Sequence, residues 1–235
     1  SWYPSSIEIP TLQIGGWYDH NIDKMMTWYK ATRQQAEISV REQQYLLVGP
    51  WVHGGTGAAF VGSATQGELS YPNAGNVSNQ MAWDFMNYYL LDSPNNWQNT
   101  PKITYYETGK NLWATTDANS LEITNYEPIY LSANNGLVPN SNYGNSSFMS
   151  LPTNPNPTIG GATLHTTLDQ GPYDQNDLDQ RSDLLTFSSN ELLSDITISG
   201  RTKIIVYISS TVADCDIAVR LADIYPDGRS MLITD

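Results

Sequence analysis

Residues 9–19, IPTLQIGGWYD, decide how this chain folds. An apolar, strand-like run over residues 9–14 leads into two glycines and two aromatic residues, and the next side chain is the carboxylate of Asp19. Residues 44–53, QYLLVGPWVH, follow the same plan and lead to the imidazole of His53. Each stretch predicts a buried strand that ends in a tight loop carrying one chemically useful side chain.

A segment with helical spacing lies between the two strands, because apolar residues recur at helical intervals over residues 21–36. The predicted order is therefore strand, Asp19, helix, strand, His53. An α/β-hydrolase sheet presents the acid and the base of a Ser-His-Asp triad in this chain order. In such a triad the histidine takes the proton of the nucleophile, and the carboxylate fixes its tautomer and stabilises the imidazolium.

Both residues also have ordinary alternative roles. Asp19 stands where an aspartate often caps the following helix, and His53 fits a surface loop. A metal site built from Asp19, His20 and Asp23 is a further alternative, although no histidine follows at the fourth position that a helical zinc site requires. Four aromatic residues either wall an acyl pocket or pack beneath the sheet: Trp17, Tyr18, Tyr45 and Trp51.

The composition narrows the classes of partner. Eleven basic residues against 24 acidic ones give a formal net charge of −13, so nucleic acid is not an expected partner. No apolar run approaches the length that crosses a bilayer, so no membrane partner is expected. The single cysteine, Cys215, excludes an internal disulfide and a thiolate metal cluster. We expect no metal or cofactor, and a small-molecule ester or peptide-like substrate as the partner.

The chain changes character near residue 125. Before it, the pattern alternates strand and helix, with a second helix predicted over 79–91 after a Ser78 cap and a strand over 101–108. After it, short strand-like runs lie between turn-rich stretches: 128–131, 184–187, 196–198, 202–209 and 217–225. The predicted fold class is α/β plus all-β: residues 1–124 form the C-terminal portion of an α/β-hydrolase catalytic domain, and residues 125–235 form an incomplete jelly-roll β-sandwich.

The nucleophile of the predicted triad is missing, because no Gly-x-Ser-x-Gly elbow occurs in the sequence. We therefore expect the chain to be a fragment of a longer serine hydrolase, with its serine in polypeptide outside these residues, and to be inactive alone. Open sheet edges and apolar faces would then be covered by the rest of that polypeptide or by an oligomer contact.

Six motifs in order along the chain carry a family resemblance: GWYD (16–19), GPWVH (49–53), TGKNLW (108–113), GPYDQ (171–175), RSDLL (181–185) and DIYPDGR (223–229). Together they resemble the X-Pro dipeptidyl-peptidase and cocaine esterase group of serine hydrolases, which includes the α-amino acid ester hydrolases. The resemblance implies that Asp19 is the triad acid and His53 the triad base. It also implies that the serine, the helical cap and a tyrosine of the oxyanion hole precede Ser1, and that the closing jelly-roll strands follow Asp235.

The sequence departs from the amino-ester-hydrolysing relatives, which hold the substrate ammonium group with carboxylates two and three places after the triad aspartate. Here those places are Asn21 and Ile22, which favours a neutral or hydrophobic acyl ester, with X-Pro dipeptidyl-peptidase activity still open. Two rival interpretations remain. One is a carbohydrate-binding jelly-roll module, and the other is a catalytically inactive homologue.

Overall fold

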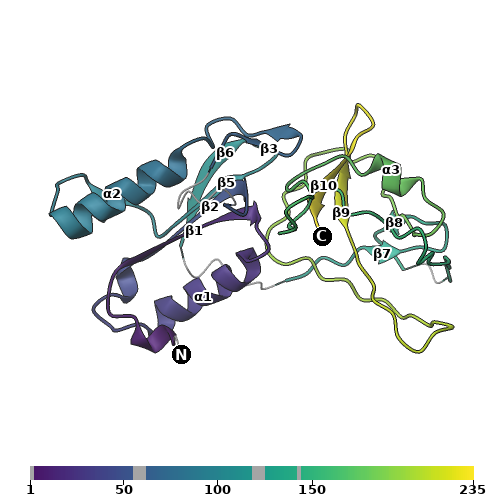
Figure 1. Ribbon diagram of the computed structural model, residues 1–235, viewed down its shortest axis with the longest axis horizontal. Helices are drawn as coiled ribbons and strands as arrows, with labels where there is room; N and C mark the ends of the chain where they lie inside the picture. The colour runs from purple at the N-terminus through teal and green to yellow at the C-terminus, as the bar shows by residue number, and fades with distance from the viewer. Residues whose placement is uncertain (1–2, 55–61, 118–124, 142–143) are drawn as a thin grey trace. The chain divides into compact units, whose positions relative to one another are not determined.

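A computed structural model describes residues 3–54, 62–117, 125–141 and 144–235 (Figure 1). The chain forms two compact units. The first unit comprises Ser1–Ser120, Thr158–Asp174 and Arg220–Asp235, and the second comprises Leu121–Pro157 and Gln175–Val219. Two stretches of the predicted β-domain thus pack within the first unit. The predicted division between residues 124 and 125 adjoins residues 118–124, which lie outside the described residues, and it stays a prediction.

The first unit is built on a four-stranded mixed sheet. Its strands are β1 (Thr11–Tyr18), β2 (Gln44–Val52), β5 (Ile103–Glu107) and β6 (Leu112–Thr116), in the spatial order β1-β2-β5-β6. Strands β1, β2 and β5 are parallel, and β6 runs antiparallel to β5. The long helices are α1 (Ile22–Gln35), between β1 and β2, and α2 (Val77–Leu91), before β5. All five elements predicted for residues 1–124 are therefore present.

The two helices cover opposite faces of the sheet (Figure 1). Gly15 faces α1, since a methyl group built on it would meet the side chain of Met25. Val48 is paired with Gly15 and shares its face, so Tyr45, three residues earlier in β2, points to the other face. The Tyr45 ring there contacts Phe85 of α2. Within the described residues no helix has both the length and the apolar composition to cross a bilayer.

Helix α2 begins two residues earlier than predicted, and Ser78 does not cap it. The cap position belongs to Asn76, whose φ of 65° is left-handed, and the backbone carbonyl of Asn76 accepts the N–H of Gln80. Ser78 is instead a buried residue inside the first turn. The prediction was wrong because a serine and an asparagine two residues apart both suit a cap, and the backbone conformation decides between them.

Short elements complete the described chain. The 3-10 turns are Pro4–Ser6, Arg41–Gln43 and Trp97–Asn99, and the short helix is α3 (Asn176–Asp179), which the sequence did not predict. The hairpins are β3 (Thr65–Gln66) with β4 (Leu69–Ser70), β7 (Tyr130–Leu131) with β8 (Leu137–Val138), and β9 (Leu221–Ile224) with β10 (Ser230–Thr234). The last hairpin turns at Pro226-Asp227-Gly228, as predicted, with Gly228 at a φ of 91°.

Three predicted strands do not form. Residues 184–187, 196–198 and 202–209 have no strand structure, and the apolar residues of the last run, Ile204 and Ile208 among them, are exposed. A β-strand exists only where a neighbouring strand pairs with its backbone, and no described strand pairs with these runs. The prediction failed because a local run of β-branched and apolar residues favours a strand but does not specify the strand that pairs with it.

Candidate active site

A β-bulge sets the register between the ends of β1 and β2. From Thr11↔Gln44 to Gly16↔Gly49 the pairing advances one residue for one, and it then skips to Tyr18↔Val52. The extra residue is in β2, in the Pro50-Trp51 stretch, and proline lacks the N–H that a regular ladder needs. Because of this extra residue, Asp19 stands beside His53 directly after the two strands. Without it, Asp19 would stand beside Val52.

Gly16 makes this bulge possible. A methyl group built on Gly16 would overlap the backbone carbonyl of Trp51, so only a residue without a side chain fits against the bulged strand. The glycine of the first motif therefore allows the close approach of the two strands immediately before the candidate catalytic residues. The same packing fixes where both strands end.

The structure brings Asp19 and His53 together. Oδ2 of Asp19 lies 3.0 Å from Nδ1 of His53, a hydrogen-bond distance. Nδ1 donates in the tautomer in which Nε2 is an acceptor, and Nε2 has no hydrogen-bond partner among the described residues. The Asp19 side chain is mostly buried, and that of His53 is 38% exposed. One imidazole nitrogen is thus held by a carboxylate while the other stays open to a substrate or a nucleophile.

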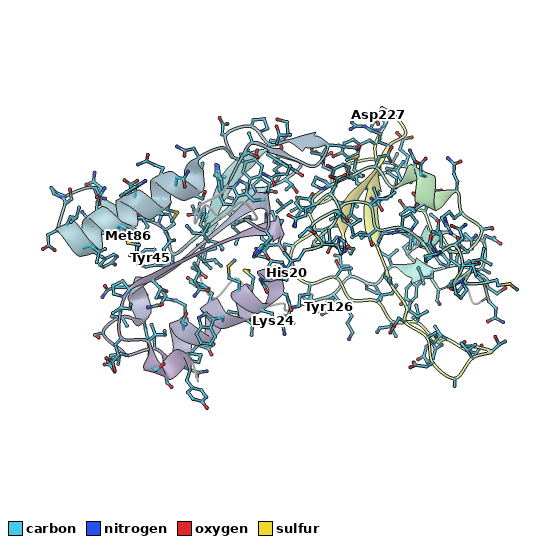
Figure 2. The ribbon with its side chains drawn as sticks, viewed as in Figure 1. His20, Lys24, Tyr45, Met86, Tyr126 and Asp227 are labelled. Carbon is cyan, nitrogen blue, oxygen red and sulfur yellow. The ribbon has the colours of Figure 1, made fainter. Side chains whose placement is uncertain are left out.

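The second oxygen of Asp19 is also occupied. Oδ1 accepts the backbone N–H of Asn21 at 2.7 Å and lies 3.2 Å from Nδ1 of His20. The His20 and His53 rings meet edge to face, with their centroids 4.8 Å apart (Figure 2 labels His20). The bond to Asn21 precedes α1, whose cap position is Asn21 and not Asp19, so the alternative in which Asp19 caps the helix is wrong. The metal alternative grouped His20 with Asp19, whereas the contact between the His20 and His53 rings was not predicted.

A cluster of aromatic residues supports the residues that precede the site. Tyr18 is buried with Tyr71 and Tyr106, and Val52 and Trp17 pack against them. The Tyr18 and Tyr71 hydroxyls lie 3.1 Å apart, and burial raises the pKa of both hydroxyls, so they remain neutral. The positions immediately before Asp19 and His53 are therefore fixed in a rigid core.

Most of the aromatic residues that were candidates for an acyl pocket pack inside the protein. Tyr18, Tyr45 and Trp51 are buried, and the Trp51 indole N–H donates to the carbonyl of Ala74 at 3.2 Å. Tyr45 packs against Phe85 and Trp97, beneath α2 (Figure 2). Trp17 is only partly buried, and its indole N–H donates to the carbonyl of Tyr106 at 2.8 Å. Of the two roles considered for these four aromatic residues, packing within the protein therefore explains their positions.

Residues 171–174 of the GPYDQ motif join the β3–β4 hairpin to β10, all within the first unit. The carbonyl of Pro172 accepts the N–H of Glu68 at 2.9 Å, and Oε2 of Glu68 accepts the N–H of Asp174 at 3.0 Å. Oδ1 of Asp174 in turn accepts the N–H of Ser230 at 2.8 Å. Gln66 in β3 accepts the N–H of Val52, the residue before His53. Residues far apart in the sequence thus brace the loop region beside the site.

The structure groups a different set of residues around a candidate metal site from the set that the sequence indicated. Asp19 and His20 are grouped with His53 and not with Asp23, and one ligand atom from each of the three lies within 4.8 Å of the others. The third histidine, His165, is exposed and bonds locally to Thr167.

Two protein-family models match different parts of the chain. A family model described as X-Pro dipeptidyl-peptidase (S15 family) matches residues 2–55, which include Asp19 and His53. A second model, described as the X-Pro dipeptidyl-peptidase C-terminal non-catalytic domain, matches residues 95–235, more than half of the chain. The chain therefore belongs to the X-Pro dipeptidyl-peptidase and cocaine esterase-like family, and the resemblance found in the motifs is confirmed.

The chain is also similar to individual proteins. The cocaine esterase of Rhodococcus sp. (strain MB1 Bresler) is 26% identical over 237 residues, covering 96% of this chain and 40% of the esterase. The crystal structure of an aminopeptidase from the marine sediment archaeon Thaumarchaeota archaeon shares the fold, with a TM-score of 0.52 and 21% identity. That match covers 75% of this chain and 30% of the aminopeptidase chain. This chain thus spans well under half the length of these relatives.

Proposed function

We propose that this chain supplies the acid and the base of a serine hydrolase that cleaves carboxylic esters or amides. The observation that carries the proposal is the 3.0 Å contact between Oδ2 of Asp19 and Nδ1 of His53 at the carboxyl ends of two neighbouring parallel strands. The nucleophilic serine belongs to polypeptide outside this chain. We refer to the full-length protein that carries the chain as the parent polypeptide.

In the first half of the reaction, Nε2 of His53 accepts the proton of the serine hydroxyl as its oxygen attacks the acyl carbon. The resulting imidazolium is stabilised by the Asp19 carboxylate, which holds Nδ1–H throughout and does not take the proton. His53 then donates the proton to the leaving alcohol or amine, and an acyl-enzyme ester remains on the serine.

In the second half, water enters in place of the leaving group. Nε2 of His53 accepts a proton from the water as its oxygen attacks the acyl carbon, and the proton returns to the serine oxygen when the acid leaves. Groups outside this chain stabilise the negative charge on the carbonyl oxygen. The contribution of this chain is to hold one imidazole nitrogen so that the other is correctly oriented and basic.

The residues after Asp19 favour a neutral acyl group. Asn21 uses its backbone N–H to bind Asp19, and Ile22 begins α1, so neither place offers a carboxylate for a substrate ammonium group. An acyl esterase specificity follows, with X-Pro dipeptidyl-peptidase activity as the second candidate because the matched family models carry that name.

The proposal extends to the architecture. Residues 1–124 would form the last part of an α/β-hydrolase domain, and residues 125–235 a jelly-roll domain whose remaining strands lie outside the chain. The support is the sheet order with helices on both faces, and the non-catalytic family model that matches residues 95–235.

The test is a substrate panel. The parent polypeptide would be assayed against p-nitrophenyl esters of rising acyl length and against X-Pro-anilides, beside His53→Ala and the control His165→Ala. We expect ester hydrolysis that falls by about 10³-fold or more in His53→Ala and is unchanged in His165→Ala. Equal activity in the His53→Ala variant and the parent would remove His53 from the mechanism.

A further inference from the structure

The side chains around Asp19 form a set of metal ligands in addition to the proposed triad pair. Asp19 lies between two imidazoles, with Nδ1 of His20 3.2 Å from Oδ1 and Nδ1 of His53 3.0 Å from Oδ2. Two imidazoles and one carboxylate are a common zinc ligand set, in which a water or an exogenous group takes the fourth position. Calcium and magnesium prefer sites made entirely of oxygen ligands, so this donor set favours zinc.

The spacing of the three residues suits a single ion. Ligand atoms about 2.0–2.1 Å from a tetrahedral zinc lie roughly 3.4 Å from one another. One ligand atom from each of Asp19, His20 and His53 lies within 4.8 Å of the other two, so closing around an ion needs only small side-chain rotations. Both histidines have room for these rotations, because their side chains are 31% and 38% exposed.

The local charge also suits a cation. Among the described residues, Asp19 forms ion pairs only with His20 and His53, so neither a lysine nor an arginine neutralises its carboxylate. The whole chain carries a formal charge of −13, which raises the concentration of cations near its surface.

We propose that Asp19, His20 and His53 form a zinc-binding site that inhibits the enzyme. The inhibitory effect rests on the proposed function, since it arises because the ion uses two members of the triad. Zinc bound to an imidazole nitrogen of His53 takes a lone pair that the proton transfer needs. Zinc bound to Asp19 weakens the hydrogen bond that fixes the imidazole. His20 is the residue that turns a catalytic pair into a three-ligand site.

Binding is tested separately from activity. The parent polypeptide, stripped of metal with a chelator, would be titrated with Zn²⁺ in a calorimeter beside the variants His20→Phe and His20→Asn and the control His165→Phe. We expect one site in the parent and in His165→Phe, and an affinity reduced about tenfold or more in both His20 variants. Circular dichroism would show whether each variant is folded, and the asparagine variant covers a failure of the larger phenylalanine to fit.

Inhibition is tested in the same proteins. Zn²⁺ should slow ester hydrolysis by the parent, and the concentration giving half inhibition should rise about tenfold in the His20 variants, each compared with its own zinc-free rate. A parent that binds no zinc, or zinc binding equally tight in the folded His20 variants, would overturn the site. A parent without hydrolase activity would instead overturn the proposed function, while the calorimetric result would still decide whether the site exists.

Discussion

At the scale of single residues, the candidate site is a carboxylate with both oxygens occupied. Oδ2 of Asp19 meets His53, and Oδ1 accepts the N–H of Asn21 and faces His20. A carboxylate held at both oxygens cannot rotate freely, so its orientation toward His53 is fixed. This orientation is what a triad acid must provide, because a misplaced imidazole accepts the proton in the wrong geometry.

Replacing Asp19 by asparagine tests that orientation. The amide side chain would present either an oxygen or an N–H₂ group to His53, and the second would hold the imidazole in the wrong tautomer. We expect kcat of the parent polypeptide to fall about 10³–10⁴-fold in Asp19→Asn with little change in KM. An Asp23→Asn control should keep full activity. A drop of less than tenfold in Asp19→Asn would contradict the role of the carboxylate.

Tyr29 gives a prediction for stability at high pH. Its hydroxyl is buried and donates to the carbonyls of Lys102 and Gln44, at 3.2 and 3.4 Å, and burial raises its pKa to about 12. Between pH 10 and 12 the unfolded chain loses this proton while the folded chain keeps it. The unfolding free energy therefore falls as pH rises, by up to about 1.4 kcal/mol per pH unit from this group.

The Tyr29→Phe variant isolates this contribution. At pH 7 it should be less stable by about 1 kcal/mol, because the hydroxyl bonds are lost. That difference should shrink between pH 10 and 12, since phenylalanine has no proton to lose. Urea unfolding at pH 7, 9.5 and 11, followed by circular dichroism, measures it. Stability curves that stay parallel over this range would show that Tyr29 is not the titrating group.

At the scale of secondary-structure elements, the β-bulge between β1 and β2 decides which residues meet. The register before the bulge would pair Asp19 with Val52, and the extra residue in the Pro50-Trp51 stretch pairs it with His53. The bulge needs Gly16, whose missing side chain leaves room for the Trp51 carbonyl. The geometry of the site is therefore a property of two strands and not of the two residues alone.

Gly16→Ala should therefore damage both the strand pairing and the site. The added methyl group would push on the Trp51 backbone, so we expect a loss of about 2–3 kcal/mol in unfolding free energy and a fall in activity larger than the loss of folded protein explains. Gly109→Ala is the matched control, because a methyl group built there meets nothing within 4 Å. Equal behaviour of the two variants would mean that the bulge does not position Asp19.

The sequence predicted the elements of the first unit well because each carries its own signal. The apolar runs before Asp19 and His53 and the helical spacing of residues 21–36 are local patterns, and the order of these elements brings the two side chains to one edge of a parallel sheet. The bulge was not predicted, since it depends on how Gly16 packs against Trp51 across the sheet. The contact from His20 also depends on the turn after β1.

The β-rich region was predicted less well, because the formation of its strands depends on partners that the local sequence does not specify. The turn at 226–228 was found because Pro-Asp-Gly has its own backbone preference. The runs 196–198 and 202–209 are rich in residues that favour strands, but a strand needs a partner whose identity no local pattern gives.

At the scale of the whole molecule, the compact units do not coincide with the residues that the two family models match. The stretches 158–174 and 220–235, matched by the model of the non-catalytic domain, pack in the same unit as β1 and β2. Strand β1 has β2 as its one strand partner among the described residues, and α2 exposes Trp83, Leu90 and Leu91. The covering of these surfaces by the parent polypeptide or by an oligomer contact stays a prediction.

An Asp174 variant tests whether this residue couples the β3–β4 hairpin to β10. Its Oδ1 accepts the N–H of Ser230, and its own N–H donates to Glu68. Asp174→Ala should destabilise the first unit by about 1–2 kcal/mol and speed hydrogen exchange at the Ser230 amide. Asp177→Ala, an exposed aspartate three residues on, should change neither. Unchanged exchange at Ser230 in Asp174→Ala would show that the motif does not hold β10.

The most direct measurement of the central claim is the labelling rate of the parent polypeptide by a fluorophosphonate, which reacts only with an activated serine. We predict one labelled serine, and a labelling rate lowered about 10³-fold in both His53→Ala and Asp19→Asn, because the two residues act as one unit. The isolated 235-residue chain should not be labelled. Stoichiometric labelling of that chain, or undiminished labelling of the His53→Ala variant, would contradict the account.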